Sequence, residues 1–190
     1  MARRVVLWNL LTLDGYFEGA EKWDLSYHET AWGPELEAFS LEQADEVGAL
    51  LFGRVTYEGM AAYWKDVDGP IADFMNGVPK VVFSRSLTRV DWANARLVRT
   101  RAVAEVQRLK IEEAPGDLFV FGSADLADSL LDAGLVDELR LGLVPMLLGN
   151  GTPFFKLRRS PIDLEHLGTR QLGPGCTLLR YRPVSLDPDG

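Results

Sequence analysis

The stretch Ala49–Thr56, with the sequence ALLFGRVT, decides the fold class of this chain. Its first four residues are apolar, which is typical of a short buried strand, and Gly53-Arg54 ends that strand. Val55–Ala62 continues with the pattern of a short helix. A strand that turns directly into a helix is the repeating unit of α/β proteins, so this stretch predicts an α/β fold.

Similar runs of strand length recur along the rest of the chain. They lie at Val5–Leu11, Lys80–Phe83, Arg96–Arg99, Asp117–Phe121, Glu138–Val144, Leu164–Arg170 and Thr177–Arg182. Helical patterns separate many of them, at Glu35–Val47, Ile71–Met75, Ala102–Glu113 and Ala124–Ala133. Because helices connect parallel neighbours in a sheet, the alternation predicts a central, mostly parallel sheet with flanking helices. The last two strands have no helix between them and are predicted to pair antiparallel, which makes the sheet mixed.

Length and turn signals set the domain organisation. The 190 residues suit one domain, and we predict that residues 1–183 form it. Residues 184–190 follow the last strand and are predicted to be a flexible tail. Glu18–Gly33 shows no clear period and is predicted to be a long loop.

Composition excludes several classes of partner. The chain has 20 Lys and Arg residues against 28 Asp and Glu residues, and this net charge of −8 argues against a nucleic-acid surface. Cys176 is the single cysteine and His28 and His166 are the only histidines, so neither a disulfide framework nor a metal site is predicted. The apolar run Val5–Leu13 is too short for a membrane span and lacks a cleavage site, so it is predicted to be a buried strand. We therefore expect no membrane partner and a cytoplasmic location.

Small, polar and basic residues follow three of the predicted strands. Gly53-Arg54-Val55-Thr56, Ser84-Arg85-Ser86 and Gly122-Ser123 stand at the carboxyl ends of strands, the usual position of a ligand in an α/β sheet. Glycine lets a backbone approach a ligand, and the helices that begin after the first and third motifs would present free N–H groups to a phosphate. Arg54 and Arg85 could clamp a phosphate monoester, the group that separates NADP from NAD. The Rossmann and Walker A fingerprints are absent from the sequence.

Six motifs in order carry a resemblance to a known family. They are TLDGY at 12–16, LFGRVTYE at 51–58, KVVFSR at 80–85, FGS at 121–123, GLVDELRL at 134–141 and PMLLGNGTPF at 145–154. Over Arg4–Arg182 this order resembles the dihydrofolate-reductase-like superfamily. Within it, the order is most similar to the reductase domain of the bifunctional riboflavin-biosynthesis deaminase–reductase and its stand-alone bacterial relatives. The resemblance implies a three-layer fold, NADPH as cofactor and a small-molecule substrate, and we also expect a homodimer.

Carried over motif by motif, the resemblance implies which residues hold NADPH. These are Asn9, Leu10 and Leu11 against the nicotinamide; Gly53, Arg54, Val55 and Thr56 at the pyrophosphate and the 2′-phosphate side; Phe83, Ser84 and Arg85 beside the adenosine and its 2′-phosphate; and Phe121, Gly122, Ser123, Ala124, Asp125 and Leu126 around the pyrophosphate. The residues at the strand ends, interpreted without the family resemblance, indicate the same region.

Three departures from the family pattern bear on the substrate. Ser123 stands where dihydrofolate reductases have the second of two glycines, and Gly142 stands where a threonine supports the acid that protonates the pterin. No zinc motif of the deaminase type precedes the domain. Neither a folate reductase nor the bifunctional riboflavin enzyme is therefore predicted, and the resemblance does not name the substrate.

Asp14 is the candidate catalytic residue, with two interpretations left open. It either makes a turn with Gly15 after the first strand or lies beside the nicotinamide as a proton donor or substrate ligand. Glu35 and Glu37 are the other candidate acids, although negative charge is favourable in a first helical turn without any catalytic role.

The predicted loop carries Trp23, Tyr27, His28 and Trp32. These side chains could stack on a flat substrate as a lid, or they could anchor the loop or pack against a dimer partner.

The leading hypothesis is an NADPH-dependent reductase that transfers a hydride to a small, heterocyclic or carbonyl-bearing substrate, as the related riboflavin and folate reductases do. The cofactor carries the hydride, which fits a sequence without an evident catalytic dyad. An NADP(H)-binding protein without turnover is the alternative. A structural homodimer that uses Glu138–Val144 and Pro145–Phe155 as its contact would leave Arg54 and Arg85 unexplained.

Overall fold

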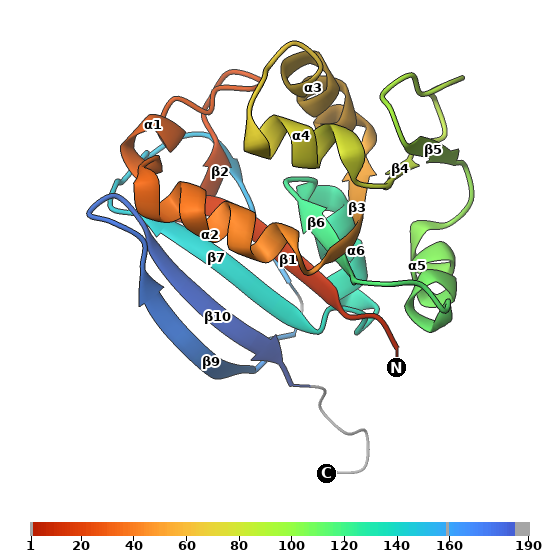
Figure 1. Ribbon diagram of the computed structural model, residues 1–190. Coiled ribbons are helices and arrows are strands. Elements are labelled where there is room, and N and C mark those ends of the chain that lie inside the picture. The colour runs from red at the N-terminus through yellow and green to blue at the C-terminus, as the bar shows by residue number, and fades with distance from the viewer. Residues whose placement is uncertain (1, 159, 185–190) are drawn as a thin grey trace.

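A computed structural model describes residues 2–158 and 160–184 and contains an eight-stranded sheet in the order β5-β4-β3-β6-β1-β7-β10-β9 (Figure 1). The strands of the protein are β1 (Val5–Thr12), β2 (Tyr16–Glu18), β3 (Val47–Gly53), β4 (Lys80–Phe83), β5 (Ala95–Val98), β6 (Asp117–Phe121), β7 (Glu138–Val144), β8 (Thr152–Pro153), β9 (Leu164–Gln171) and β10 (Thr177–Pro183). The strands from β5 to β7 in this order run parallel, whereas β10 is antiparallel to β7 and to β9. The predicted α/β class, the mostly parallel sheet and the antiparallel closing pair are confirmed.

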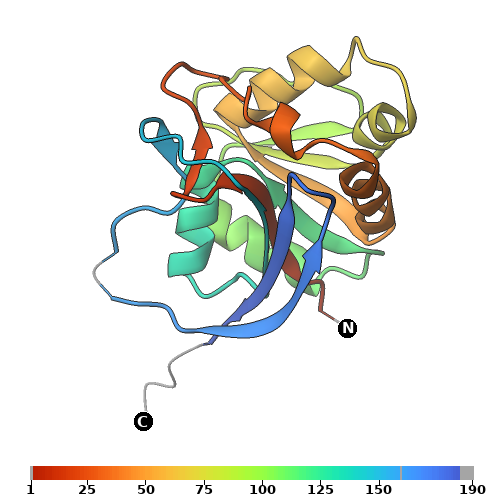
Figure 2. The same ribbon diagram turned by 90° about the vertical axis from the view of Figure 1, so that its left-hand side faces the viewer.

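Helices cover both faces of this sheet and give three layers. They are α1 (His28–Ala31), α2 (Pro34–Ala44), α3 (Arg54–Trp64), α4 (Pro70–Gly77), α5 (Ala102–Ile111) and α6 (Ala124–Asp132). α2, α3 and α4 contribute to the core on one face, and α5 and α6 to the core on the other (Figures 1 and 2). Within the described residues, no helix is both long enough and apolar enough to cross a membrane.

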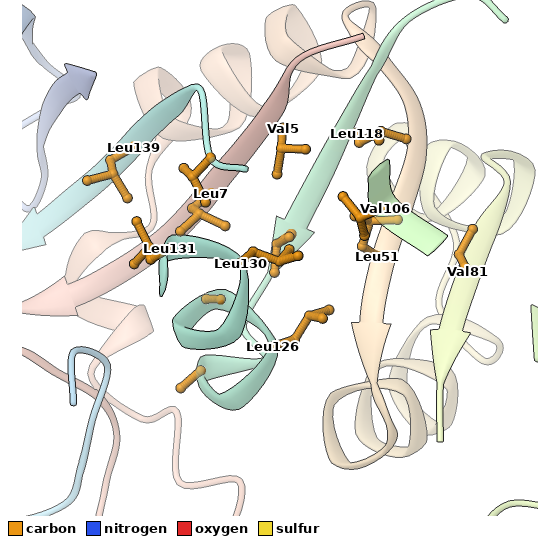
Figure 3. Packing of buried hydrophobic residues seen from close by; sticks show 14 of the residues in the cluster. Val5, Leu7, Leu51, Val81, Val106, Leu118, Leu126, Leu130, Leu131 and Leu139 are labelled. Atoms are coloured by element: carbon orange, nitrogen blue, oxygen red, sulfur yellow. The ribbon is translucent and has the colours of Figure 1, made fainter. Parts of the chain in front are cut away.

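β1 lies in the middle of the sheet because its residues are apolar on both faces. Val5 and Leu7 belong to the core that packs against α5 and α6 (Figure 3). Val6 and Trp8 belong to the opposite core, which packs against α2, α3 and α4. A strand that is buried on both faces is a nearly continuous apolar run in the sequence, as this strand is apart from Asn9 and Thr12.

The packing of α6 against the core places its N-terminus at the edge of the sheet where the parallel strands end. Leu126, Leu130 and Leu131 are buried against the sheet, while Asp125 and Asp132 are exposed. Burial of each leucine contributes about 1.5–3 kcal/mol, and together they hold the N-terminus of α6 directly beyond β6.

The boundary between α2 and β3 differs from the prediction. α2 ends at Ala44, and Val47 and Gly48 already belong to β3, so the predicted helix Glu35–Val47 was too long. The strand register shifts between Val47 and Ala49, and a side chain on Gly48 would lie 2.1 Å from the carbonyl oxygen of Pro115. Gly48 therefore permits a close crossing of two chain segments and does not end a helix.

The predicted loop Glu18–Gly33 is partly ordered as secondary structure. It begins with the last residue of β2, which pairs with β8, and it contains α1. The pairing of β2 with β8 joins segments far apart in the chain, so no local pattern indicated it. Residues 185–190 of the predicted tail lie outside the described residues.

Candidate functional site

A cleft of about 680 Å³ opens at the carboxyl ends of β1, β3, β4 and β6, where α3 and α6 begin. The predicted cofactor residues that line it are Asn9, Leu10, Gly53, Arg54, Val55, Thr56, Phe83, Phe121, Gly122, Ser123, Ala124, Asp125 and Leu126. Leu11, Ser84 and Arg85 are not among its lining residues. Residues from four separate strand ends therefore meet around one cavity.

The turn after β6 holds this end of the cleft together. Gly122 and Ser123 both adopt the left-handed conformation, with φ values of 60° and 55°. The Gly122 N–H donates to Asn9 Oδ1 at 2.7 Å, and the Ser123 N–H donates to Thr56 Oγ1 at 3.0 Å. The Gly53 N–H in turn donates to Ser123 Oγ at 3.0 Å, so the serine hydroxyl joins β6 to β3.

These internal hydrogen bonds determine which donors remain for a ligand. The N–H groups of Gly53, Gly122 and Ser123 already have acceptors within the protein. The first N–H groups of α3 and α6 have no intrahelical acceptors, and neither helix has a side-chain cap. An anion in the cleft would therefore meet the two helix N-termini rather than the glycine turns.

The end of β1 contributes one polar side chain to the cleft. Asn9 is buried, its Oδ1 accepts the Gly122 N–H, and its Nδ2 has no hydrogen-bond partner among the described residues. Leu10 lines the cleft, whereas the side chain of Leu11 is buried in the core on the α5 and α6 face.

Arg54 after β3 and Arg85 after β4 have different surroundings. Arg54 lines the cleft and pairs with Glu58 one helical turn later, with 2.9 Å between Nη1 and Oε2. Ser84 Oγ accepts the N–H groups of Ser86 and Leu87, so the Ser84 hydroxyl builds the turn. Arg85 is exposed on this turn and has no ion-pair partner in the described part of the chain.

Asp14 lies outside the cleft and is fully engaged by the protein. Its carboxylate accepts the Thr12 hydroxyl at 2.6 Å and the N–H groups of Leu148 and Gly149 at 3.1 and 2.8 Å. The Thr12 hydrogen bond, together with those backbone donors, lowers the pKa of Asp14 to about 2. This geometry favours the interpretation of Asp14 as a residue that holds the turn, and it gives no support to proton donation at neutral pH.

α2 presents an uncharged face to the cleft. Leu36, Ser40 and Gln43 line the cavity, whereas Glu35 and Glu37 are exposed on other sides of the helix. The sequence carried no signal for Ser40 or Gln43, because which helical residues face a cavity depends on how the helix packs.

The aromatic loop residues have separate roles. The Tyr27 hydroxyl donates to the Leu10 carbonyl oxygen at 2.9 Å, which anchors the loop to β1. Trp23, His28 and Trp32 line the cleft, and the Trp23 ring packs so closely on Gly59 that a side chain there would lie 1.8 Å from it. Burial lowers the pKa of His28 to about 4, so its imidazole is neutral at neutral pH.

The sheet topology and the cleft at its strand ends define an α/β domain of the dihydrofolate-reductase class. Dihydrofolate reductase from Enterococcus faecalis, solved as a complex with NADP(H), matches with a TM-score of 0.60 at 14% identity. The match covers 96% of this chain and 97% of the enzyme chain, and at this identity it concerns the fold alone.

The family within this class follows from the sequence match. Residues 3–178 match the RibD C-terminal domain, and the chain belongs to this family of dihydrofolate-reductase-like reductase domains. A crystal structure from Shewanella sp. PV-4, of a protein assigned to riboflavin biosynthesis, matches 97% of this chain and 100% of that chain, with a TM-score of 0.76 and 21% identity. The uncharacterised protein YyaP of Bacillus subtilis is 29% identical over 188 residues, 94% of each chain. The family resemblance seen in the motifs is confirmed, and none of these relatives identifies the substrate of this chain.

Proposed function

We propose that this protein is an NADPH-dependent reductase that transfers a hydride to a small heterocyclic or carbonyl-bearing substrate. The observation that carries the proposal is the meeting of two helix N-termini in one cleft, where α3 begins at Arg54 and α6 at Ala124. Their first N–H groups lack intrahelical acceptors and each helix dipole adds positive potential. Such a pair suits the two phosphates of a dinucleotide.

Two further features, one in the cleft and one that extends beyond its lining, fit NADPH. Asn9 Nδ2 is a buried donor without a partner among the described residues, which supports a hydrogen bond from it to a ligand carbonyl such as the nicotinamide carboxamide. Arg54 lines the cleft and Arg85 lies on the turn after the neighbouring strand β4, which supports recognition of the 2′-phosphate.

NADPH supplies the hydride when it is bound. The residues of the chain would orient the nicotinamide against the substrate and exclude water, and the lining by Trp8, Leu10, Trp23 and Phe121 suits both tasks. The Asp14 carboxylate is engaged outside the cleft, so the proposal assigns it no proton transfer.

Cofactor preference tests the role of the two arginines. We expect NADPH to bind more tightly than NADH, and Arg54→Ala or Arg85→Ala to weaken NADPH binding roughly three- to tenfold while leaving NADH binding nearly unchanged. A solvent-screened charge-assisted hydrogen bond contributes on the order of 1 kcal/mol, which corresponds to this range. Isothermal titration calorimetry measures both affinities, with Arg182→Ala on β10 as a matched charge control. Equal affinities for the two cofactors in the native protein would contradict the 2′-phosphate assignment.

A pair of glycine variants tests the placement of the dinucleotide. Gly122 and Gly134 have φ values of 60° and 63°, so alanine at either position should cost about 1–2 kcal/mol of stability. At Gly122 the added Cβ would also lie 3.0 Å from Thr56 Cγ2, whereas at Gly134 nothing lies within 4 Å. We expect Gly122→Ala to weaken NADPH binding at least tenfold, because the side chain of Thr56 in the first turn of α3 must give way to the added Cβ, and Gly134→Ala to leave binding unchanged. Normal NADPH binding by folded Gly122→Ala would place the dinucleotide elsewhere.

A further inference from the structure

The cleft has two chemically different ends. Its cationic lining residues are Arg54, which pairs with Glu58, and Lys156, which pairs with Asp125 at the start of α6. The inner wall, which we define as the part of the lining from α2, α4 and the later turns of α3, contains no charged residue in the described structure. Its apolar residues are Leu36, Met60, Trp64, Ile71, Phe74 and Met75.

Two polar residues belong to this inner wall, and only one of them is satisfied by the protein. The Ser40 hydroxyl donates to the Leu36 carbonyl oxygen at 2.8 Å. Gln43 is 2% exposed and lines the cleft, and its Oε1 has no hydrogen-bond partner among the described residues. Buried polar atoms are normally paired, so an unpaired acceptor in an apolar wall suggests a ligand donor.

The chain path separates Gln43 from the basic residues. Gln43 is close to the end of α2, which leads into β3 at Val47, and Arg54 follows the other end of β3. The seven residues of β3 span roughly 20 Å at about 3.3 Å per residue. Gln43 and Arg54 therefore flank opposite ends of β3, and a ligand group beside Gln43 meets the uncharged inner wall.

We propose that the substrate is an uncharged, flat, apolar molecule whose inner end carries a single N–H or O–H group that donates to Gln43 Oε1. This inference rests on the proposed function in calling the molecule a substrate. A phosphate or carboxylate at this end would be desolvated against Trp64, Phe74 and Met75 without a cation to pair with it, which strongly disfavours such ligands. Gln43 thereby determines specificity for the donor group, and the aromatic residues select a flat ring.

Two pairs of probe compounds, titrated into the full chain, test the two parts of the proposal. One part is the N–H or O–H donor to Gln43, and the other is the absence of charge. Isocarbostyril has a free lactam N–H, and its N-methyl derivative has the same ring without that donor. α-Naphthol and α-naphthyl phosphate differ by the charged group. Titration calorimetry without NADPH should show that isocarbostyril binds about tenfold more tightly than its N-methyl derivative, as expected for one buried hydrogen bond. α-Naphthol should bind at least tenfold more tightly than α-naphthyl phosphate.

The variant Gln43→Leu tests whether the difference in affinity between isocarbostyril and its N-methyl derivative depends on this one residue. It should abolish the preference for isocarbostyril and leave binding of the N-methyl derivative unchanged. Because the native Oε1 is unpaired, the ligand-free variant should unfold at the same or a higher urea concentration than the native protein, which a purely structural glutamine would not allow. Gln107→Leu on the exposed side of α5 is the matched control and should change none of these results.

Two results would overturn the proposal. One is a folded Gln43→Leu protein that still prefers isocarbostyril to its N-methyl derivative. The other is α-naphthyl phosphate binding as tightly as α-naphthol to the native protein. Neither result depends on the cofactor, because the probes are titrated without NADPH. The NADPH affinity is measured in a separate titration and should be the same in native and Gln43→Leu protein. Failure of the native protein to bind NADPH would contradict the proposed function and leave the probe comparison intact.

Discussion

The Asp14 carboxylate shows how one side chain can join two distant loops at the residue scale. Its hydrogen bonds to the N–H groups of Leu148 and Gly149 connect the turn after β1 to the loop after β7. The Thr12 hydroxyl completes the set and contributes most to the lowered pKa of about 2. An ionised carboxylate is therefore part of the folded structure across the physiological range.

Asp14→Asn tests this structural role through its pH dependence. A folded pKa of about 2 against an ordinary value of 3.8 means that the ionised group stabilises the native state above pH 3.8. This contribution is lost as the pH falls towards 2, because the unfolded chain then binds the proton more readily than the native chain does. We expect native protein to be more stable than Asp14→Asn in urea at pH 6, and the difference to shrink between pH 4 and pH 2.

The alternative catalytic role predicts a different pattern for the same variant. A general acid at Asp14 would lose 10²–10⁴-fold in turnover on replacement by Asn, with stability unchanged. Assays with carbonyl and pterin-like compounds that oxidise NADPH distinguish the two outcomes. Turnover lost at constant stability would contradict the structural role.

The placement of a residue was predictable at this scale where its type has one strong physical use, whereas its role in cofactor binding stays a prediction. Gly53 and Gly122 at strand ends, and Arg54 after the first of them, are found around the cleft because strand ends converge in a parallel sheet. The sequence did not indicate that the Ser84 hydroxyl is used by its own turn or that Gln43 faces the cavity. Those outcomes depend on rotamers and helix rotation, which no local pattern encodes.

At the scale of secondary-structure elements, Lys80 shows how one side chain can join a helix to a strand. It begins β4 and has 0% exposure, and its Nζ donates to the carbonyl oxygens of Asn76, Val78 and Ala93 at 3.2, 2.8 and 2.9 Å. The Trp92 ring centroid lies 4.4 Å from the same atom. A cation at the last carbonyls of a helix is favourable, so Lys80 ties the end of α4 to β4 and to the segment before β5.

Lys80→Met should destabilise the protein by about 2–4 kcal/mol, because three carbonyl oxygens, that of Val78 buried, lose a charged donor while the side-chain volume is nearly kept. Urea unfolding measures the change. Lys65→Met is the matched control, since Lys65 pairs with Asp91 on the surface, and it should change stability by less than about 0.5 kcal/mol. Equal effects of the two variants would show that the buried lysine does not join these elements.

The element order was predictable because each unit is encoded by local apolar spacing. β4, β6 and β7 begin and end at the predicted residues. β2 and β8 were missed because they pair with each other over a long sequence separation and contain few residues. The register shift at Gly48 is not encoded locally, because glycine both ends helices and permits irregular strands, and the carbonyl of Pro115 that requires it is distant in sequence.

At the scale of the whole molecule, the homodimer stays a prediction. β7 lies inside the sheet between β1 and β10 and is mostly buried, so it cannot be the contact considered in the purely structural hypothesis. The loop after β7 and the adjacent turn after β1 instead expose Leu147 and Leu13, at 73% and 63%.

The cleft joins both halves of the molecule, because its lining comes from elements on opposite faces of the sheet. α3 belongs to the core that contains Val6, and α6 to the core that contains Val5 and Leu7. A ligand held by both helix N-termini therefore stabilises the two cores together. Unfolding of either core would disrupt the proposed binding site.

We expect this coupling to appear in thermal unfolding with NADPH. A hundredfold excess of NADPH over its dissociation constant should add about 2.7 kcal/mol to the free energy of unfolding. For a chain of this size the midpoint should rise by about 5–10 °C. The shift should be the same by near-ultraviolet circular dichroism, which reports the packing of the aromatic side chains, with Trp8, Trp64 and Trp92 in the core that contains Val6, and by far-ultraviolet circular dichroism, which reports all helices. The adenosine 2′-phosphate should account for part of the shift, so NADH at the same concentration should raise the midpoint less. A shift confined to the near-ultraviolet signal would show that NADPH stabilises one core only, and that α3 and α6 do not hold it jointly.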